Sequence, residues 1–228
     1  MVCMEILKVR NEPGYGLKLY LVKEGMHKKV KASKIEKFGE ILFLAPLEVH
    51  IAVTNKCNMN CDYCYAMDEN FLKHKDMTID EIKQILNELN DRNVFKISWS
   101  GGEPLVRKDF KDILIYADQC GFSQSIITNG MAISNEWIDL FRTLNIGIQL
   151  SLHEAGNEFW NKCSVLVSND IDVIIDIVME PKLQGNVEEL VSMAEKAGIT
   201  KIKFGPLIPV GKATIDVGLN EYKKILII

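Results

Sequence analysis

Three cysteines stand close together in the segment TNKCNMNCDYC, which runs from Thr54 to Cys64. They recur at spacings of four and three residues: Cys57, Cys61 and Cys64. Thiolates in such runs bind zinc or an iron–sulfur cluster. A structural zinc site requires four ligands, and three nearby side chains are candidates for the fourth: Asp62, Asp68 and His74. A four-iron cluster held by three thiolates leaves one iron open, which suits a site that binds a substrate or cofactor.

The bulk composition is that of a soluble globular protein. The chain has 228 residues, of which 47% are hydrophobic and 25% charged, and its net charge is −4. That charge provides no general attraction to nucleic acid or to an anionic membrane. No apolar run approaches the roughly 18 residues that span a bilayer, and we expect no signal peptide in the first residues, which carry charges and have no apolar stretch. We therefore expect a cytoplasmic protein, in which the six cysteines are ligands or buried thiols and not disulfides.

From about residue 47 onward, apolar β-branched runs alternate with amphipathic stretches. The runs predict strands at 48–54, 95–100, 124–128, 146–151, 171–179 and 201–205. The stretches predict helices at 77–92, 109–121, 134–144, 186–198 and 219–228, the first with a capping box formed by Thr78 and Glu81. The segment after the fourth strand is short and poorly patterned, and no helix bounds are assigned to it. Six βα units predict an α/β fold with a parallel sheet, either a partial (βα)6 TIM-type barrel or a doubly wound sheet.

The first 46 residues have a different pattern. Two strands are predicted at 4–10 and 17–22, joined by a turn rich in glycine and proline. A strongly basic segment, HKKVKASKIEK, follows and is interpreted as a solvated surface strand or loop. We therefore predict two parts, a small β-rich N-terminal extension at 1–46 and a core at 47–228.

The cysteine spacing and a second motif together resemble a known family. CxxxCxxC after the first core strand, with Tyr63 before the last cysteine, resembles the cluster loop of radical S-adenosylmethionine (radical SAM) enzymes. The second core strand is followed by SGGEPL, which resembles that family's GGE motif at Gly101, Gly102 and Glu103. Two glycines allow close approach of a ligand to the backbone, and the carboxylate can bind the ammonium of a methionine moiety. The resemblance covers about residues 47–228 and favours the partial barrel.

Other strand ends carry further candidates for binding the cofactor S-adenosylmethionine. Asn129 follows the third strand and Ser151 ends the fourth, and both can hydrogen-bond a ribose or a carboxylate. The segment GPLIPVGKA resembles the part of the family that contacts adenine, with Gly205 and Leu207 as candidates. His153 is interpreted as a surface or capping residue, with a place at the mouth of the site as the alternative.

The resemblance implies a [4Fe-4S] cluster on Cys57, Cys61 and Cys64 whose open iron binds S-adenosylmethionine. One electron, from an external donor such as a flavodoxin or ferredoxin, would cleave the cofactor to a 5′-deoxyadenosyl radical. That radical takes a hydrogen atom from a substrate. The sequence around the motifs resembles most the branch of the family that modifies peptides and proteins or finishes haem-type tetrapyrroles. We expect a peptide or protein side chain as substrate, with a tetrapyrrole or another small molecule as the alternative. A non-catalytic iron–sulfur protein, or an inactive core that lacks a C-terminal domain, is the hypothesis of another class.

Overall fold

The computed structural model describes residues 6–12, 16–21, 26–29, 45–64, 66, 74–179, 187–207 and 211–212. The helix predicted at 219–228 and the candidate ligand Asp68 lie outside these residues. Within them, no helix is both long and apolar enough to cross a membrane. The chain divides into two compact units, one from 1–51, 78–98 and 111–124, the other from 52–77, 99–110 and 125–228.

The N-terminal residues form a three-stranded antiparallel sheet. Its strands are β1 (Ile6–Glu12), β2 (Gly16–Leu21) and β3 (Met26–Lys29), in the order β1-β2-β3. The first two strands were predicted from the sequence and are confirmed. The domain boundary between residues 46 and 47 remains a prediction.

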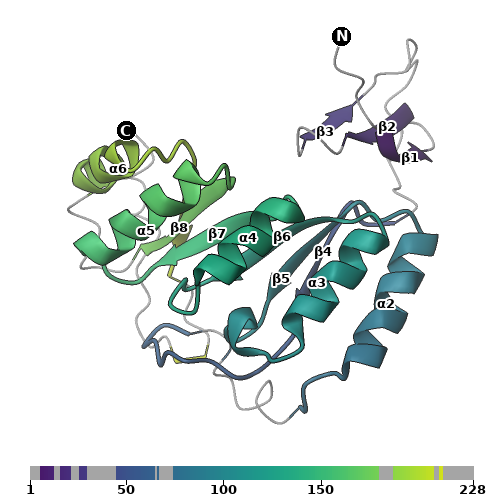
Figure 1. Cartoon of the computed structure of the whole chain (residues 1–228), viewed down its shortest axis with the longest axis horizontal. Coiled ribbons are helices and arrows are strands. Elements are labelled where there is room, and N and C mark those ends of the chain that lie inside the picture. The colour runs from purple at the N-terminus through teal and green to yellow at the C-terminus, as the bar shows by residue number, and fades with distance from the viewer. Residues whose placement is uncertain are drawn as a thin grey trace. The chain divides into compact units, whose positions relative to one another are not determined.

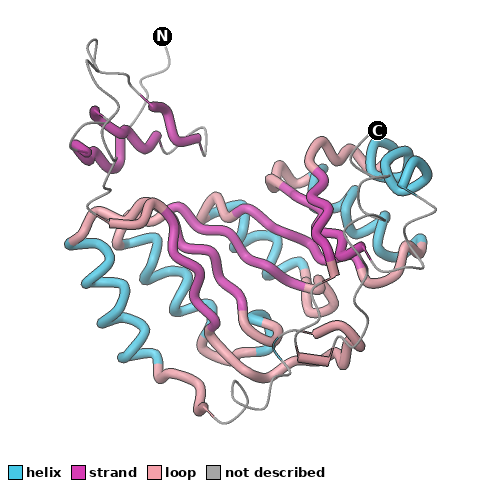
Figure 2. The backbone as a smooth tube through the Cα atoms, turned by 180° about the vertical axis from the view of Figure 1, so that it is seen from behind, coloured by secondary structure: helices cyan, strands magenta, loops and turns pink. Residues whose placement is uncertain are grey.

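Six further strands lie side by side in the core sheet (Figure 2). The sheet is parallel. They are β4 (Glu48–Ala52), β5 (Lys96–Ser100), β6 (Ser123–Thr128), β7 (Gly147–Leu152), β8 (Val173–Met179) and β9 (Ile202–Pro206). The order in the sheet is the order in the chain. In a doubly wound sheet the strand order reverses at a switch point, so the order in the sheet differs from the order in the chain. The topology is therefore that of a partial TIM-type barrel, as predicted.

Helices connect successive strands of this sheet (Figure 1). They are α2 (Ile79–Asp91), α3 (Phe110–Gln119), α4 (Asn135–Thr143), α5 (Asn157–Ser168) and α6 (Val187–Lys196), with a short 3₁₀ turn η3 (Pro104–Val106) after β5. The predicted capping box of α2 is present. Glu81 donates its main-chain N–H to Thr78 Oγ1 at 3.3 Å and accepts from the main chain of Thr78 at 2.7 Å.

Helix α5 fills the segment after the fourth core strand, which the sequence pattern left unassigned. Its buried face consists of Trp160, Cys163 and Leu166, which recur every three residues. The pattern is hard to recognise because a cysteine supplies the central apolar position and the helix begins with two polar residues, Asn157 and Glu158. Burial raises the pKa of the Cys163 thiol to about 12, so it packs as a small hydrophobic group. Cys120, also expected to be buried, is only half-buried.

Alternate residues of β6, β7 and β8 are buried, so the two faces of these strands differ. Helices α4 and α5 cover one face (Figure 1). The half-buried residues point to the other face, and four of them line a cavity: Ile127, Ser151, Asp176 and Val178. The helices thus support the strands from one side while the opposite side stays open to a ligand.

The buried face of α5 predicts a large difference between two neighbouring substitutions. Leu166→Ala removes a fully buried side chain, and the free energy of unfolding should fall by about 2–5 kcal/mol. Val165→Ala changes a side chain that is 46% exposed and should alter it by less than about 0.5 kcal/mol. Denaturant unfolding followed by circular dichroism measures both, and equal losses would contradict the orientation of α5.

Candidate functional site

The segment from Val53 to Cys64, here called the cysteine loop, leaves β4 and is bound to the segment that leaves β5. The main chain of Gly102 donates to Thr54 O at 2.7 Å, and that of Glu103 donates to Lys56 O at 2.8 Å. These two bonds fix the loop just before its first cysteine. The cysteines therefore start from a defined position at the carboxyl end of the parallel strands, where sites of barrel proteins lie.

The two glycines of the GGE motif are required by this contact. Gly101 has φ +141°, and a Cβ there would overlap the main chain of Thr54. A Cβ on Gly102 would overlap the main chain of Lys56. The motif was predicted to allow close approach of a ligand. In the structure the backbone that approaches these glycines is the cysteine loop itself.

Two charged side chains also hold the start of the cysteine loop. Asp76 accepts from Thr54 Oγ1 at 2.7 Å and from the main chain of Asn55 at 2.8 Å. Arg107 donates to Val53 O at 2.5 Å and forms a two-point pair with Asp109 at 2.7 and 3.1 Å. Burial acts to raise the pKa of Asp76, but the hydrogen bonds and the charge of Arg107 outweigh it and lower that pKa. Asp76 is thus held as a carboxylate that accepts hydrogen bonds from the loop.

Glu103 is nearly fully buried, and its carboxylate already has three donors. Its oxygens accept from Thr128 Oγ1 at 2.7 Å, from the main chain of Asn129 at 2.8 Å and from the main chain of Leu105 at 3.1 Å. Burial raises the pKa of Glu103, and these hydrogen bonds oppose the rise. The side chain thus links the end of β5 to the end of β6. Its predicted contact with a methionine ammonium remains a prediction.

Asn129 extends the same network to the cysteine loop. Its side-chain Nδ2 donates to Asn58 Oδ1 at 2.8 Å, and its Oδ1 accepts from the main chain of Met131 at 2.9 Å. Asn129 lines a second hollow together with Ser151 and Lys162. The structure therefore gives Asn129 a loop-holding contact, while its predicted role toward the cofactor remains a prediction.

The three cysteines share the loop but differ in exposure. Cys57 is exposed, whereas Cys61 and Cys64 are half-buried. Burial raises the pKa of Cys61, and the neighbouring Cys64 and Cys57 raise it further because adjacent thiolates repel. In the part of the chain that the structure describes, no three His, Cys, Asp or Glu side chains are gathered as a metal site. Three thiols on one anchored loop nevertheless provide the sulfur donor set of an iron–sulfur cluster.

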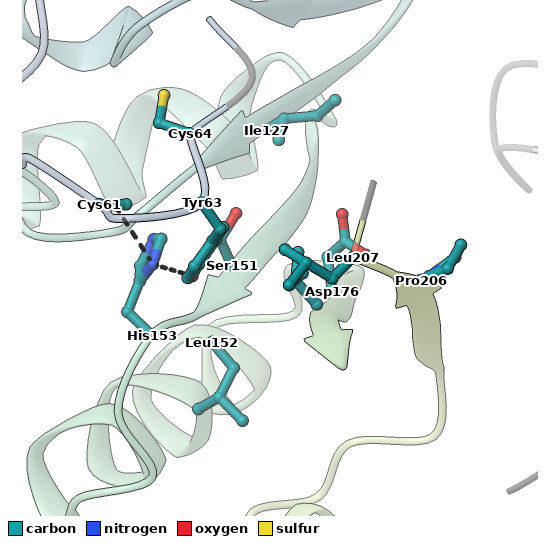
Figure 3. A pocket seen from close by; sticks show the side chains of 11 residues that line it. Cys61, Tyr63, Cys64, Ile127, Ser151, Leu152, His153, Asp176, Pro206 and Leu207 are labelled. Atoms are coloured by element: carbon teal, nitrogen blue, oxygen red, sulfur yellow. Dashed lines mark hydrogen bonds between the residues drawn. The ribbon is translucent and has the colours of Figure 1, made fainter. Parts of the chain in front are cut away.

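A cavity of about 450 Å³ opens beside Cys61 and Cys64 (Figure 3). Tyr63 forms part of its wall and packs with Leu207 and Val178. Ser151 lines it from β7. The structure thus brings four predicted residues to this cavity besides Ser151: Cys61, Tyr63, Cys64 and Leu207. Gly205 directly precedes the lining residue Pro206 but does not itself line the cavity. A Cβ at Gly205 would meet only ordinary van der Waals contacts.

Several residues of the site were missed or undervalued in the sequence. His153, interpreted first as a surface or capping residue, lines the cavity and contacts Tyr63 and Cys61. Asp176 faces the cavity from β8, where it accepts from Gln149 at 2.6 Å. Lys212 donates its main-chain N–H to Cys64 O at 3.2 Å. The inward register of Asp176 could have been found from strand alternation, but the contact of Lys212 depends on tertiary structure alone.

Comparison with known proteins identifies the family. The model of the Radical SAM superfamily matches residues 51–209, more than half of the chain. The chain therefore belongs to the radical SAM superfamily. It is 38% identical over 108 residues to an S-adenosylmethionine-dependent nucleotide dehydratase of Selenomonas ruminantium, a match that covers 44% of this chain and 38% of that protein. It is 34% identical over 104 residues to a PqqA peptide cyclase of Bradyrhizobium diazoefficiens, covering 46% and 26%.

Solved structures show the same fold. SuiB of Streptococcus suis bound to its precursor peptide SuiA matches with a TM-score of 0.68 and 19% identity, over 81% of this chain and 47% of SuiB. A structure of SuiB bound to S-adenosylmethionine matches with a TM-score of 0.67. The chain spans less than two thirds of the length of these relatives.

The glycine contacts predict a sharp effect of one added methyl group. Gly102→Ala places a Cβ against Lys56 O, so the cysteine loop must shift and iron uptake on anaerobic reconstitution should fall several-fold. Gly156→Ala is the matched control, since a Cβ there meets nothing within 4 Å. Iron and sulfide analysis of folded protein measures the effect. Equal iron content in both variants would show that the contact does not position the cysteines.

Substitution of Asp76 provides a second, independent test of how the cysteine loop is anchored. Asp76→Ala removes the carboxylate that accepts from Thr54 and Asn55, and the variant should lose about 1–3 kcal/mol of stability because these two hydrogen bonds are lost. Asp91→Ala, at an exposed position near the end of α2, should change stability by less than about 0.5 kcal/mol. Thermal unfolding of the iron-free proteins measures both. A midpoint for Asp76→Ala equal to that of the control would refute the anchoring role.

Proposed function

We propose that this chain is the core of a radical SAM enzyme, in which Cys57, Cys61 and Cys64 hold a [4Fe-4S] cluster with one iron open to S-adenosylmethionine. One observation carries the proposal. The cysteine loop is anchored at the carboxyl end of β4, and two of its cysteines lie in the wall of a cavity large enough for a nucleoside. When bound, cluster and cofactor supply a 5′-deoxyadenosyl radical that removes hydrogen from a substrate.

The residues around the cavity have separate tasks in this proposal. Tyr63, Val178 and Leu207 form an apolar wall against which the flat adenine ring would pack. Ser151 offers a hydroxyl for the ribose or the carboxylate of the cofactor. The anchored cysteine loop keeps these groups at a fixed distance from the thiolates.

We propose a peptide or protein side chain as the substrate. The support comes from relatives: the PqqA peptide cyclase and SuiB bound to its precursor peptide SuiA. The electron would come from an external one-electron donor such as a flavodoxin or ferredoxin. A small-molecule substrate is the second candidate, because the nucleotide dehydratase is 38% identical over the matched residues. The 1–46 extension and the 47–228 core are proposed as the two domains of the chain.

Cofactor cleavage tests the proposal. The protein, reconstituted anaerobically with iron and sulfide and reduced with dithionite, should convert S-adenosylmethionine to 5′-deoxyadenosine. A variant with Cys57, Cys61 and Cys64 changed to alanine should make none, while Cys120→Ala, outside the loop, should behave as the parent protein. Chromatography quantifies the product. Iron binding without deoxyadenosine would favour a non-catalytic iron–sulfur protein or an inactive core, and zinc binding without iron would overturn the proposal.

Isotope transfer separates the two substrate classes. Cells that make the protein are grown in deuterated medium, and their peptides and nucleotides are extracted as two separate pools. Each pool is added in turn to the reduced protein with unlabelled S-adenosylmethionine. Deuterium in 5′-deoxyadenosine from the peptide pool, and none from the nucleotide pool, is expected. Mass spectrometry reads the label. Label from nucleotides alone would replace the peptide proposal with the small-molecule one.

A further inference from the structure

His153 stands at the contact between the cavity and the cysteine loop. Its Nδ1 lies 3.6 Å from Cys61 Sγ and 2.5 Å from Tyr63 Oη (Figure 3). His153 follows β7, and Cys61 and Tyr63 follow β4, so segments about ninety residues apart in sequence meet at this one ring nitrogen. The position is therefore set by the fold and not by a local turn.

Two features hold the imidazole in place. The preceding residue, Leu152, is buried and pairs with Ile177 at the end of the β7–β8 ladder, which fixes the main chain. The ring itself stacks on Tyr63, with centroids 5.9 Å apart and an interplanar angle of 19°. A side chain fixed at both its base and its ring loses little further freedom when it makes a hydrogen bond, so the bond to sulfur is available at low entropic cost.

The direction of the hydrogen bond follows from the chemistry of a cysteine bound to iron. Such a sulfur is a thiolate, which carries no proton and can only accept. The bond therefore requires the hydrogen on Nδ1, and this tautomer lets one N–H be shared between Cys61 Sγ and Tyr63 Oη. N–H donors to sulfur lie farther away than donors to oxygen, and the 3.6 Å separation from Cys61 Sγ lies within hydrogen-bond reach of sulfur. Tyr63 Oη, at 2.5 Å, is close to the same ring nitrogen.

We propose that His153 is a positioning residue that donates a hydrogen bond to the Cys61 thiolate and raises the reduction potential of the cluster. Hydrogen bonds to cluster sulfurs are among the factors that set the potential, because they stabilise the more negative, reduced state. The proposal rests on the proposed function, since it needs a cluster on the loop. The shared contact also places Tyr63, and hence the apolar wall of the cavity, relative to Cys61.

The cysteine loop also contains a backbone hydrogen bond to sulfur, against which the side-chain donor can be compared. The main chain of Met59 donates to Cys57 Sγ at 3.4 Å. This donor belongs to the backbone and is retained in every side-chain variant. A change in potential on substitution of His153 therefore reports the side-chain donor against a constant backbone contribution.

The test compares two substitutions at one position. His153→Leu removes the donor while keeping apolar bulk, and His153→Asn retains an N–H at about the place of Nδ1. His74→Leu is the control, since His74 is exposed and its main-chain carbonyl, retained in the variant, accepts the bond from Asn55. Each full chain is reconstituted, its iron and sulfide are measured, and its cluster is titrated by electron paramagnetic resonance without S-adenosylmethionine.

The expected result is a more negative potential for His153→Leu, recovery of most of the shift in His153→Asn, and no shift in His74→Leu. Equal potentials for the parent protein and His153→Leu, at equal iron content, would overturn the inference and leave the proposed function standing. Equal shifts in the Leu and Asn variants would also overturn it, because a packing defect and not a lost donor would then be the cause. Failure of the parent protein to bind iron would overturn both proposals together.

Discussion

The arrangement of the site depends on one contact, the approach of the cysteine loop to the backbone of Gly101 and Gly102. Two main-chain hydrogen bonds, from Gly102 to Thr54 and from Glu103 to Lys56, join the ends of the first two core strands. A side chain at either glycine would prevent this approach. The position of the first cysteine follows from this anchor, because Lys56 directly precedes Cys57.

The other contacts of the site extend this anchor outward. Asp76 and Arg107 hold the start of the loop, while the buried Glu103 carries the connection to β6 through Thr128 and Asn129. The end of β7 adds the contact of His153 with the loop. The segments that follow β5, β6 and β7 thus all contact the same loop, which is the arrangement expected of a parallel barrel whose carboxyl edge carries the site.

Periodicity predicted the fold, and spacing singled out the cysteines and the GGE motif, but neither showed how these residues interact or which other residues join them. Alternating apolar runs indicated the six core strands, and the cysteine spacing with the GGE motif indicated the family. Helix α5 was missed because Cys163 fills a core position that a search for aliphatic residues passes over. Asp76 carries no local signature, since its partners lie about twenty residues away. The role of the glycines was assigned to a ligand because sequence alone cannot show that the neighbouring loop fills the same space.

The most direct test of the account asks whether S-adenosylmethionine binds the open iron of a cluster on the cysteine loop. The measurement is electron–nuclear double resonance of the reduced protein with cofactor labelled with ¹⁵N in the amino group and ¹⁷O in the carboxylate. The account predicts hyperfine coupling of the cluster to both labels, and loss of the cluster signal when Cys57, Cys61 and Cys64 are replaced. A reduced cluster that shows no coupling to either label would contradict it.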